Sequence, residues 1–191
     1  MKFDIYPEKA QYLTGETIKL LLELDTPITS EIQAVILVTH LQDTIYETKR
    51  NITSQISEVT IPGRDTDFGG YGVELLAYQN GNLLGRCHTA FDVVSSCNKA
   101  IRYGFLSDFD TEDGDNCRDV SNLRKFHINY VQYYDWSYRH DQLVSHEQKY
   151  RDMMGRLVDL QTVKTKIEAC RKYGMKTIGY GAVYAASREY Y

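Results

Sequence analysis

The hydrophobic pattern of this 191-residue chain changes its period near Ser95, and this change limits the fold more than any other feature. Before Ser95, apolar residues alternate with polar ones, as in Ile18–Leu24, and a period of two is typical of half-buried strands. Comparable runs occupy 34–41, 44–52, 57–61, 73–78 and 83–94. Six or seven short strands without a helix predict an antiparallel β-sandwich of immunoglobulin-like type over residues 1–97.

Glycines are expected to mark the turns of this sandwich. The pair Asn80-Gly81 is typical of a two-residue hairpin. The segment Gly69-Gly70-Tyr71-Gly72 is expected to be a turn rather than a phosphate loop, because no helix follows it. Residues 7–16 predict a first strand that breaks and resumes at a glycine.

Beyond Ser95 the sequence predicts helices that alternate with strands. The acidic segment 108–116 is expected to be a loop, with two of its carboxylates capping a helix that buries Val120 and Leu123. The nearly continuous apolar run 128–134 predicts a strand buried on both faces, as in a parallel sheet.

A long loop from about Ser137 to Arg156 is expected to lead into a second helix over 160–173. Asp159 is predicted to be its N-cap, and Gly174 its C-terminal stop. Residues 175–184 then predict another strand. The order helix, strand, helix, strand indicates the beginning of a βαβ series.

Composition excludes several classes of function. The formal net charge is −4 and the basic residues are scattered, which argues against binding to nucleic acid. No segment is long and apolar enough for a membrane span, and the first residues lack a signal peptide, so we expect a cytoplasmic protein or a trimmed N-terminus. The sixteen tyrosines suit a glycan surface, but they also suit packing in a β domain. Buried free thiols, rather than disulfides or a zinc site, are expected for Cys87, Cys97, Cys117 and Cys170.

The segment 126–141 opens as a strand and closes as a dense cluster of aromatic and hydrogen-bonding side chains. Such a change is typical of the rim of a barrel enzyme's pocket, where a buried strand positions a loop that carries the chemistry. Three segments in order resemble glycoside hydrolase family 66: RYGFLSDF at 102–109, HINYVQYYDWSYRHD at 127–141 and GMKTIGYGAVYAA at 174–186. This family contains endo-dextranases and cycloisomaltooligosaccharide glucanotransferases.

The resemblance implies an immunoglobulin-like sandwich followed by a (β/α)8 barrel, with residues 98–191 as the start of that barrel. It implies retaining hydrolysis or transglycosylation of α-1,6-glucans such as dextran, by an Asp nucleophile and a Glu acid/base, with no cofactor. Both carboxylates lie on later barrel strands in the family, so no catalytic residue is assigned here. Members of the family are usually secreted, so the resemblance favours a trimmed N-terminus as the reason why no signal peptide is found here.

The length of the chain supports a truncated barrel. A (β/α)8 barrel takes about 250 residues, and residues 98–191 are enough for only two or three of its eight units. An open parallel edge and an uncovered apolar face favour aggregation. We therefore expect the chain to be the N-terminal part of a longer enzyme and to be inactive alone.

The resemblance implies that one set of side chains contacts glucose units: Asp135, Trp136, Tyr138, Arg139, His140, Tyr180 and Tyr184. Each has a structural alternative. Trp136 is either a stacking platform or a residue packed beneath the rim. Asp135 either binds a sugar hydroxyl or orients Arg139 through a charge-assisted pair, and the structural alternative is a purely structural ion pair. Tyr180 and Tyr184 could equally pack in a core.

A metal site and two other functions are alternatives to this interpretation. The histidines and acids at 140, 141, 146 and 147 lack the spacing of a strong metal site, so no metal is predicted. Two rival functions stay open. One is a non-catalytic glycan-binding or adhesive β-sandwich module, and the other is a barrel glycosidase with a different linkage preference.

Overall fold

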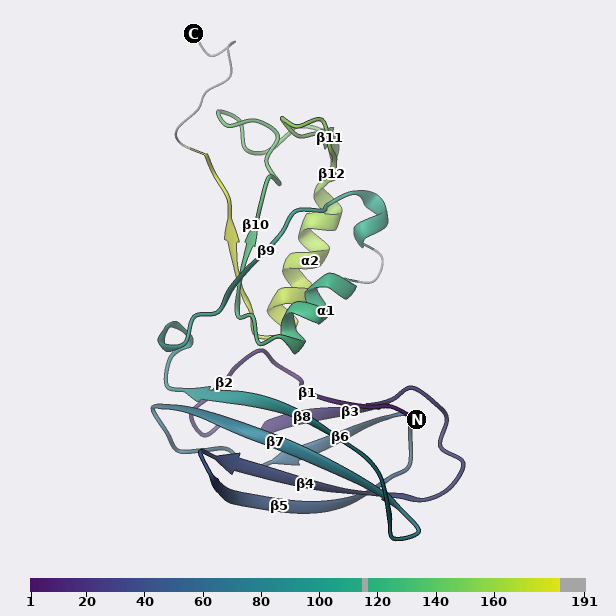
Figure 1. The fold of residues 1–191 in the computed structure, drawn as a ribbon. Helices are drawn as coiled ribbons and strands as arrows, with labels where there is room; N and C mark the ends of the chain where they lie inside the picture. The colour runs from purple at the N-terminus through teal and green to yellow at the C-terminus, as the bar shows by residue number, and fades with distance from the viewer. Residues whose placement is uncertain (115–116, 183–191) are drawn as a thin grey trace. The chain divides into compact units, whose positions relative to one another are not determined.

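The structure, a computed structural model, describes residues 1–114 and 117–182 and divides into two compact units, Met1–Ala100 and Ile101–Tyr191 (Figure 1). None of the described helices is long and apolar enough to cross a membrane. The strands of the first unit are β1 (Phe3–Pro7), β2 (Tyr12–Leu13), β3 (Ile18–Leu24), β4 (Ile32–His40), β5 (Asp43–Ile52), β6 (Ile56–Ile61), β7 (Phe68–Gln79) and β8 (Asn82–Val94), followed by a 3-10 turn, η1 (Cys97–Lys99).

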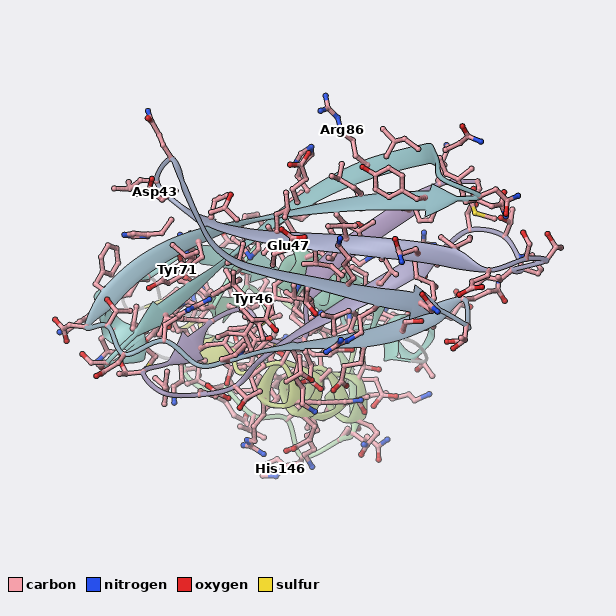
Figure 2. The ribbon with its side chains drawn as sticks, turned by 90° about the horizontal axis from the view of Figure 1, so that it is seen from below. Asp43, Tyr46, Glu47, Tyr71, Arg86 and His146 are labelled. Atoms are coloured by element: carbon pink, nitrogen blue, oxygen red, sulfur yellow. The ribbon has the colours of Figure 1, made fainter. Side chains whose placement is uncertain are left out.

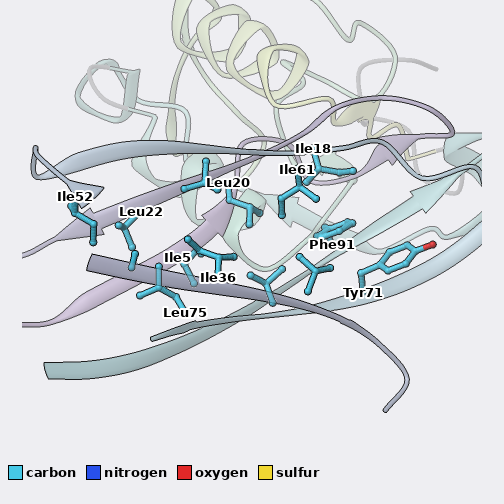
Figure 3. Close-up of a cluster of buried hydrophobic side chains, with 14 of the residues drawn as sticks. Ile5, Ile18, Leu20, Leu22, Ile36, Ile52, Ile61, Tyr71, Leu75 and Phe91 are labelled. Carbon is cyan, nitrogen blue, oxygen red and sulfur yellow. The ribbon is translucent and has the colours of Figure 1, made fainter. Parts of the chain in front are cut away.

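The first unit is a β-sandwich. A three-stranded sheet in the order β1-β3-β6 shares one apolar core with a five-stranded sheet in the order β2-β8-β7-β4-β5. Alternation places Leu20 and Leu22 of β3 in this core, where Ile36 and Leu75 of the other sheet join them (Figure 3). The predicted sandwich is thus confirmed as two sheets around one core, and its immunoglobulin-like type stays a prediction.

The first strand passes from one sheet to the other. β1 runs antiparallel to β3, and the chain then leaves this sheet after Pro7. It resumes at Tyr12, which pairs with Val93 in parallel, so the five-stranded sheet is mixed and not purely antiparallel as predicted. The break is confirmed, but resumption at a glycine is wrong. The buried Tyr12, whose hydroxyl donates to the carbonyl of Lys19 at 2.6 Å, fixes the point of re-entry instead.

The predicted turn at Gly69-Gly70 is wrong, because both glycines lie inside β7. Gly69 pairs with Val93 across the sheet. A Cβ atom at Gly69 would come within 3.0–3.2 Å of the ring of Tyr71, which stacks on Phe91 in the core. This glycine is therefore needed for close packing. The Asn80-Gly81 hairpin is confirmed, with both residues at positive φ.

The second unit contains a short parallel sheet with helices on one side (Figure 1). Its sheet order is β13-β10-β9, and both pairings are parallel. The elements of this unit are β9 (Tyr103–Leu106), the 3-10 turn η2 (Thr111–Gly114), α1 (Arg118–Lys125), β10 (Tyr130–Tyr133), β11 (Lys149–Arg151), β12 (Leu157–Asp159), α2 (Leu160–Lys172) and β13 (Lys176–Gly179). A βα series is confirmed, with β9 as a first strand that the sequence analysis missed.

The strand β10 is buried on one face only, and not on both as predicted. Val131 and Tyr133 are buried toward the helices, whereas Tyr130 and Gln132 are partly exposed. On the same open face, Phe105 of β9 is 59% exposed and Ile178 of β13 is 39% exposed. An unpartnered sheet face is the reason, since a parallel sheet is continuously apolar only where both faces are covered.

The two helices begin in different ways. The N-cap of α1 is Cys117 in the left-handed region (φ 46°), and its side chain makes no cap hydrogen bond. The predicted carboxylate caps from 108–116 stay a prediction, because residues 115–116 lie outside the described residues. Val120 is buried as predicted, and Leu123 is half-buried. In α2 the N-cap Asp159 is confirmed, because its carboxylate accepts from the amide of Gln161 at 2.8 Å. Gly174, at φ 72°, ends this helix as predicted.

The cysteines are free, and only one of the four is buried. Cys170 lies in the interior of the second unit, within 3.5 Å of the Tyr133 hydroxyl. Cys87, Cys97 and Cys117 are partly exposed, so the expectation of four buried thiols is wrong for these three. Burial raises the pKa of the Cys87 thiol to about 11, and the nearby Asp4 acts in the same direction. This thiol is therefore protonated and unreactive near neutral pH.

Candidate functional site

A pocket of about 450 Å³ opens at the carboxyl ends of β10 and β13. This edge of a parallel sheet is where α/β proteins bind ligands, because the loops after neighbouring strands converge there. The lining side chains come from those loops and from the β11–β12 hairpin: Tyr134, Asp135, Ser137, His140, Asp152, Met153, Met154, Arg156 and Tyr180.

Asp135 occupies the second position after β10 in a left-handed backbone conformation (φ 54°). Its carboxylate oxygen Oδ2 accepts a hydrogen bond from Nη2 of Arg156 at 2.8 Å. The partner is thus Arg156 and not Arg139, so the predicted pairing with Arg139 is wrong. Asp tolerates the left-handed region better than most residues, which lets the chain turn sharply at the strand end.

The predicted long loop contains a hairpin. β11 and β12 pair antiparallel, with Tyr150 opposite Val158, and the five residues 152–156 join them. Gly155 takes a φ of 82° in that loop, and its amide donates to the carbonyl of Asp152 at 3.1 Å. Strands of three residues show no detectable period, which explains why the sequence analysis missed them.

Asp152 organises this loop from a buried position. Its side chain is 2% exposed. Oδ1 accepts from the amides of Met154 at 2.9 Å and Arg156 at 2.8 Å, and Oδ2 accepts from Nε of Arg156 at 2.8 Å. These bonds satisfy a carboxylate that would otherwise be costly to bury.

Arg156 lies between two carboxylates and is itself 41% exposed. Burial acts to lower the pKa of its guanidinium, but the pairs with Asp152 and Asp135 outweigh burial and raise it. The guanidinium is therefore charged at neutral pH, as arginine is in nearly all proteins. One cation between two anions leaves the site with an excess of hydrogen-bond acceptors.

Trp136 is not among the residues that line the pocket, and its ring packs against β13. Its indole Nε1 donates to the carbonyl of Tyr180 at 3.0 Å, and the ring lies against Gly179. Its own carbonyl accepts from the hydroxyl of Tyr150, whose pKa is raised to about 12 by burial and by the nearby Asp152. These contacts correspond to the packed alternative for Trp136, and sugar stacking stays a proposal.

Tyr138 and Arg139 form a second layer beside the pocket. The guanidinium of Arg139 lies 4.0 Å from the centroid of the Tyr138 ring, and that ring packs edge-on against Tyr150 at 5.6 Å. Arg139 also donates to the carbonyls of Tyr138 and Arg151, at 2.7 and 3.2 Å. Neither residue lines the pocket, so their nearest role is to support the loop after β10.

The pocket brings together three of the seven predicted residues: Asp135, His140 and Tyr180. The Tyr180 ring packs on Tyr134 with centroids 4.7 Å apart, which forms an aromatic wall. Tyr184 lies outside the described residues.

The lining residues of the hairpin, chiefly Asp152 and Arg156, were not predicted from the sequence. An Asp followed three positions later by a Gly is a turn signal, and it could have located this loop. In the described part of the chain, no cluster of three or more His, Cys, Asp or Glu side chains has the arrangement of a metal site. The pocket offers aromatic faces, carboxylates and an imidazole, which suits an uncharged ligand rich in hydroxyl groups.

Comparisons with known proteins agree with this chemistry. Residues 7–191 match the model of glycosyl hydrolase family 66. Two cycloisomaltooligosaccharide glucanotransferases from Niallia circulans are 28% and 25% identical over 97% of this chain, which spans only about a fifth (20%) of their length.

A solved structure gives the same result for the fold. A Paenibacillus sp. cycloisomaltooligosaccharide glucanotransferase, complexed with cycloisomaltoheptaose, matches 97% of this chain and 28% of its own with a TM-score of 0.81 and 25% identity. The family match covers both compact units rather than one of them. The chain belongs to glycosyl hydrolase family 66.

Proposed function

We propose that this chain supplies the first part of a retaining glycoside hydrolase or glucanotransferase that acts on α-1,6-glucans such as dextran. The sandwich precedes the first three strands of a (β/α)8 barrel, β9, β10 and β13. The Asp nucleophile and the Glu acid/base lie on later strands outside this chain. The pocket after β10 and β13 holds glucose units of the substrate.

The pocket at the carboxyl ends of parallel strands is the observation that carries this proposal. Barrel enzymes place their active sites at this end of the barrel. The relatives named above support the substrate class, since their names describe transfer reactions on isomaltooligosaccharides. The 20% coverage of those relatives supports a catalytic pair outside the chain.

Two measurements test the enzymatic part. The purified chain, freed of host glycosidases, is expected to release no reducing ends from dextran. The second measurement uses the full-length protein, expressed from a coding frame that continues beyond the Tyr191 codon. Its cleavage of a panel of glucans is expected to be faster for α-1,6-linkages than for α-1,4- and β-linkages. Activity of the 191-residue chain alone, or a preference for another linkage, contradicts the proposal.

A second candidate function is a non-catalytic glycan-binding sandwich, and a groove on the five-stranded sheet favours it. The groove holds about 560 Å³ on the outward face of β4, β5 and β7. Figure 2 looks onto this sheet, with Glu47 of β5 labelled. Tyr78, Gln33 and Glu47 line the groove and offer a ring face with donors and acceptors.

One pair of variants separates the two functions. Tyr180→Ala removes a wall of the pocket, and Tyr78→Ala removes the ring in the groove. Dextran retardation in affinity electrophoresis is expected to weaken with Tyr180→Ala and to stay unchanged with Tyr78→Ala. The reverse result favours the binding module.

A further inference from the structure

Asp135 presents one carboxylate oxygen that no described residue uses. Oδ2 is taken by Arg156, whereas Oδ1 accepts no hydrogen bond from the described residues. The side chain is 27% exposed and lines the pocket. A carboxylate held by one oxygen keeps the other available as a strong acceptor for a hydroxyl group.

The position of this carboxylate depends on a residue 21 positions away in the chain. Asp135 follows β10, whereas Arg156 ends the loop between β11 and β12. The bond between their side chains is the direct link from the hairpin to this acceptor. Free rotation of the Asp135 side chain would otherwise have to be frozen by the ligand, at a cost in affinity.

Arg156 is itself fixed at several points by the buried Asp152. The backbone amide and Nε of Arg156 both donate to that carboxylate, and the amide of Asp152 donates to the carbonyl of Arg156 at 2.9 Å. The guanidinium therefore has little freedom before a ligand arrives. A planar, pre-organised group can hold Asp152 with Nε and Asp135 with Nη2 at once, which an ammonium group cannot reproduce in the same geometry.

We propose that Arg156 is a positioning residue for saccharide binding: anchored by Asp152 on the hairpin, it orients Asp135 so that Oδ1 accepts a glucose hydroxyl. This role rests on the proposed function, because it assumes a hydroxyl-rich ligand in the pocket. Asp152, Arg156 and Asp135 act in series, so the hairpin takes part in recognition without touching the sugar.

A double-mutant cycle tests the series. Binding of isomaltotriose to the chain is measured by saturation-transfer NMR titration for wild type, Asp135→Asn, Arg156→Met and the double variant. Each single variant is expected to lose about tenfold in affinity, the loss typical of one charge-assisted hydrogen bond, and the double variant no more than either. Arg156→Lys is expected to lose less affinity for isomaltotriose than Arg156→Met, but still to bind more weakly than the wild type.

Arg151→Met is the matched control. Arg151 lies in the same hairpin and donates to the carbonyl of Gly155 at 2.5 Å, but it makes no contact with Asp135. The affinity of the Arg151→Met variant for isomaltotriose is expected to stay within about twofold of that of the wild type. Far-UV circular dichroism of every variant checks the fold, and the Nε–H resonance of Arg156 is expected to shift on addition of isomaltotriose.

The outcomes are distinguishable. Binding by wild type with unchanged affinity in Arg156→Met overturns the positioning role and leaves the proposed function in place. Additive losses in the double variant show that Arg156 acts independently of Asp135, which also overturns it. Wild type that binds no isomaltotriose overturns the proposed function together with this role.

Discussion

The two units of this chain bury their apolar side chains in different ways. In the sandwich, strands of up to 13 residues face each other across one core, and the inward side chains of β3 and β4 are almost fully buried. In the second unit, β9 and β10 have 4 residues each; they bury side chains toward the helices and leave Tyr103 and Phe105 exposed on the other side. A sheet with one open face is completed by further structure in a barrel, whereas a sandwich completes itself.

The largest effect is expected from the sandwich core. Leu75→Ala removes a side chain that is fully buried, and it is expected to lower the free energy of unfolding by about 2–5 kcal/mol. The only Trp of the chain, Trp136, lies in the second unit, so its fluorescence follows that unit while circular dichroism follows the strand-rich sandwich. In Leu75→Ala, the urea midpoint measured by circular dichroism is expected to fall, whereas the midpoint measured by Trp136 fluorescence is expected to stay unchanged. Equal shifts of both midpoints would contradict the independence of the two units.

Lys166→Ala is expected to have the next largest effect, and on the second unit. This lysine of α2 is 1% exposed and donates to the carbonyl of Asp108 at 2.6 Å and to the carboxylate of Asp119 at 2.7 Å. Its removal leaves both acceptors without their cation and is expected to cost about 2–4 kcal/mol, read from the fluorescence transition. Lys164→Ala, on an exposed position of the same helix, is the control. If Lys166→Ala lowers the free energy of unfolding by less than Leu75→Ala does, the difference between the two units is sharpened. If it lowers this free energy by less than the control Lys164→Ala does, the prediction is contradicted.

Asp159→Ala is expected to cost about 1 kcal/mol at neutral pH, the usual value of an N-cap. Burial acts to raise the pKa of this carboxyl, but bonds from Gln161, Gln148 and Thr111 and the nearby Lys149 outweigh it and lower the pKa. A lowered folded-state pKa contributes stability above the unfolded value, near 4, which is lost as the pH falls through the folded-state value. The gap between wild type and variant is therefore expected to narrow in acid. A gap that widens below pH 4 would contradict this sign.

The smallest change is expected on the open sheet face. Phe105→Ser removes a ring that is 59% exposed and packs edge-to-face with Tyr134, with centroids 6.2 Å apart, so the loss of stability is expected to be below about 1 kcal/mol. Less apolar surface is expected to reduce self-association, measured by light scattering at rising concentration. Lys125→Ser, on α1, serves as the control. A loss as large as that of Leu75→Ala would show that this face is covered.

The difference between the units also explains what the sequence could predict. Long alternating strands such as Ile18–Leu24 repeat the pattern often enough to be recognised, and so does the helix with Asp159 as its cap. The strand Tyr103–Leu106 is too short, contains a glycine and exposes two aromatic residues, so no period marks it. The pocket lining followed the same rule only in part. Of the predicted residues in the block after β10, Asp135 and His140 line the pocket, whereas Arg156 was not predicted because it depends on a contact across 21 positions.

The transfer of the first strand between sheets has a consequence for the order of assembly. Its second half pairs Tyr12 with Val93, so this contact cannot form until nearly the whole sandwich has been synthesised. Closing so long a loop is slow, and pairings between distant residues lower the folding rate. We expect β2 to dock last. A nascent chain on the ribosome would thus hold its first strand unpaired along half its length until β8 emerges, a window in which chaperones have the most to protect.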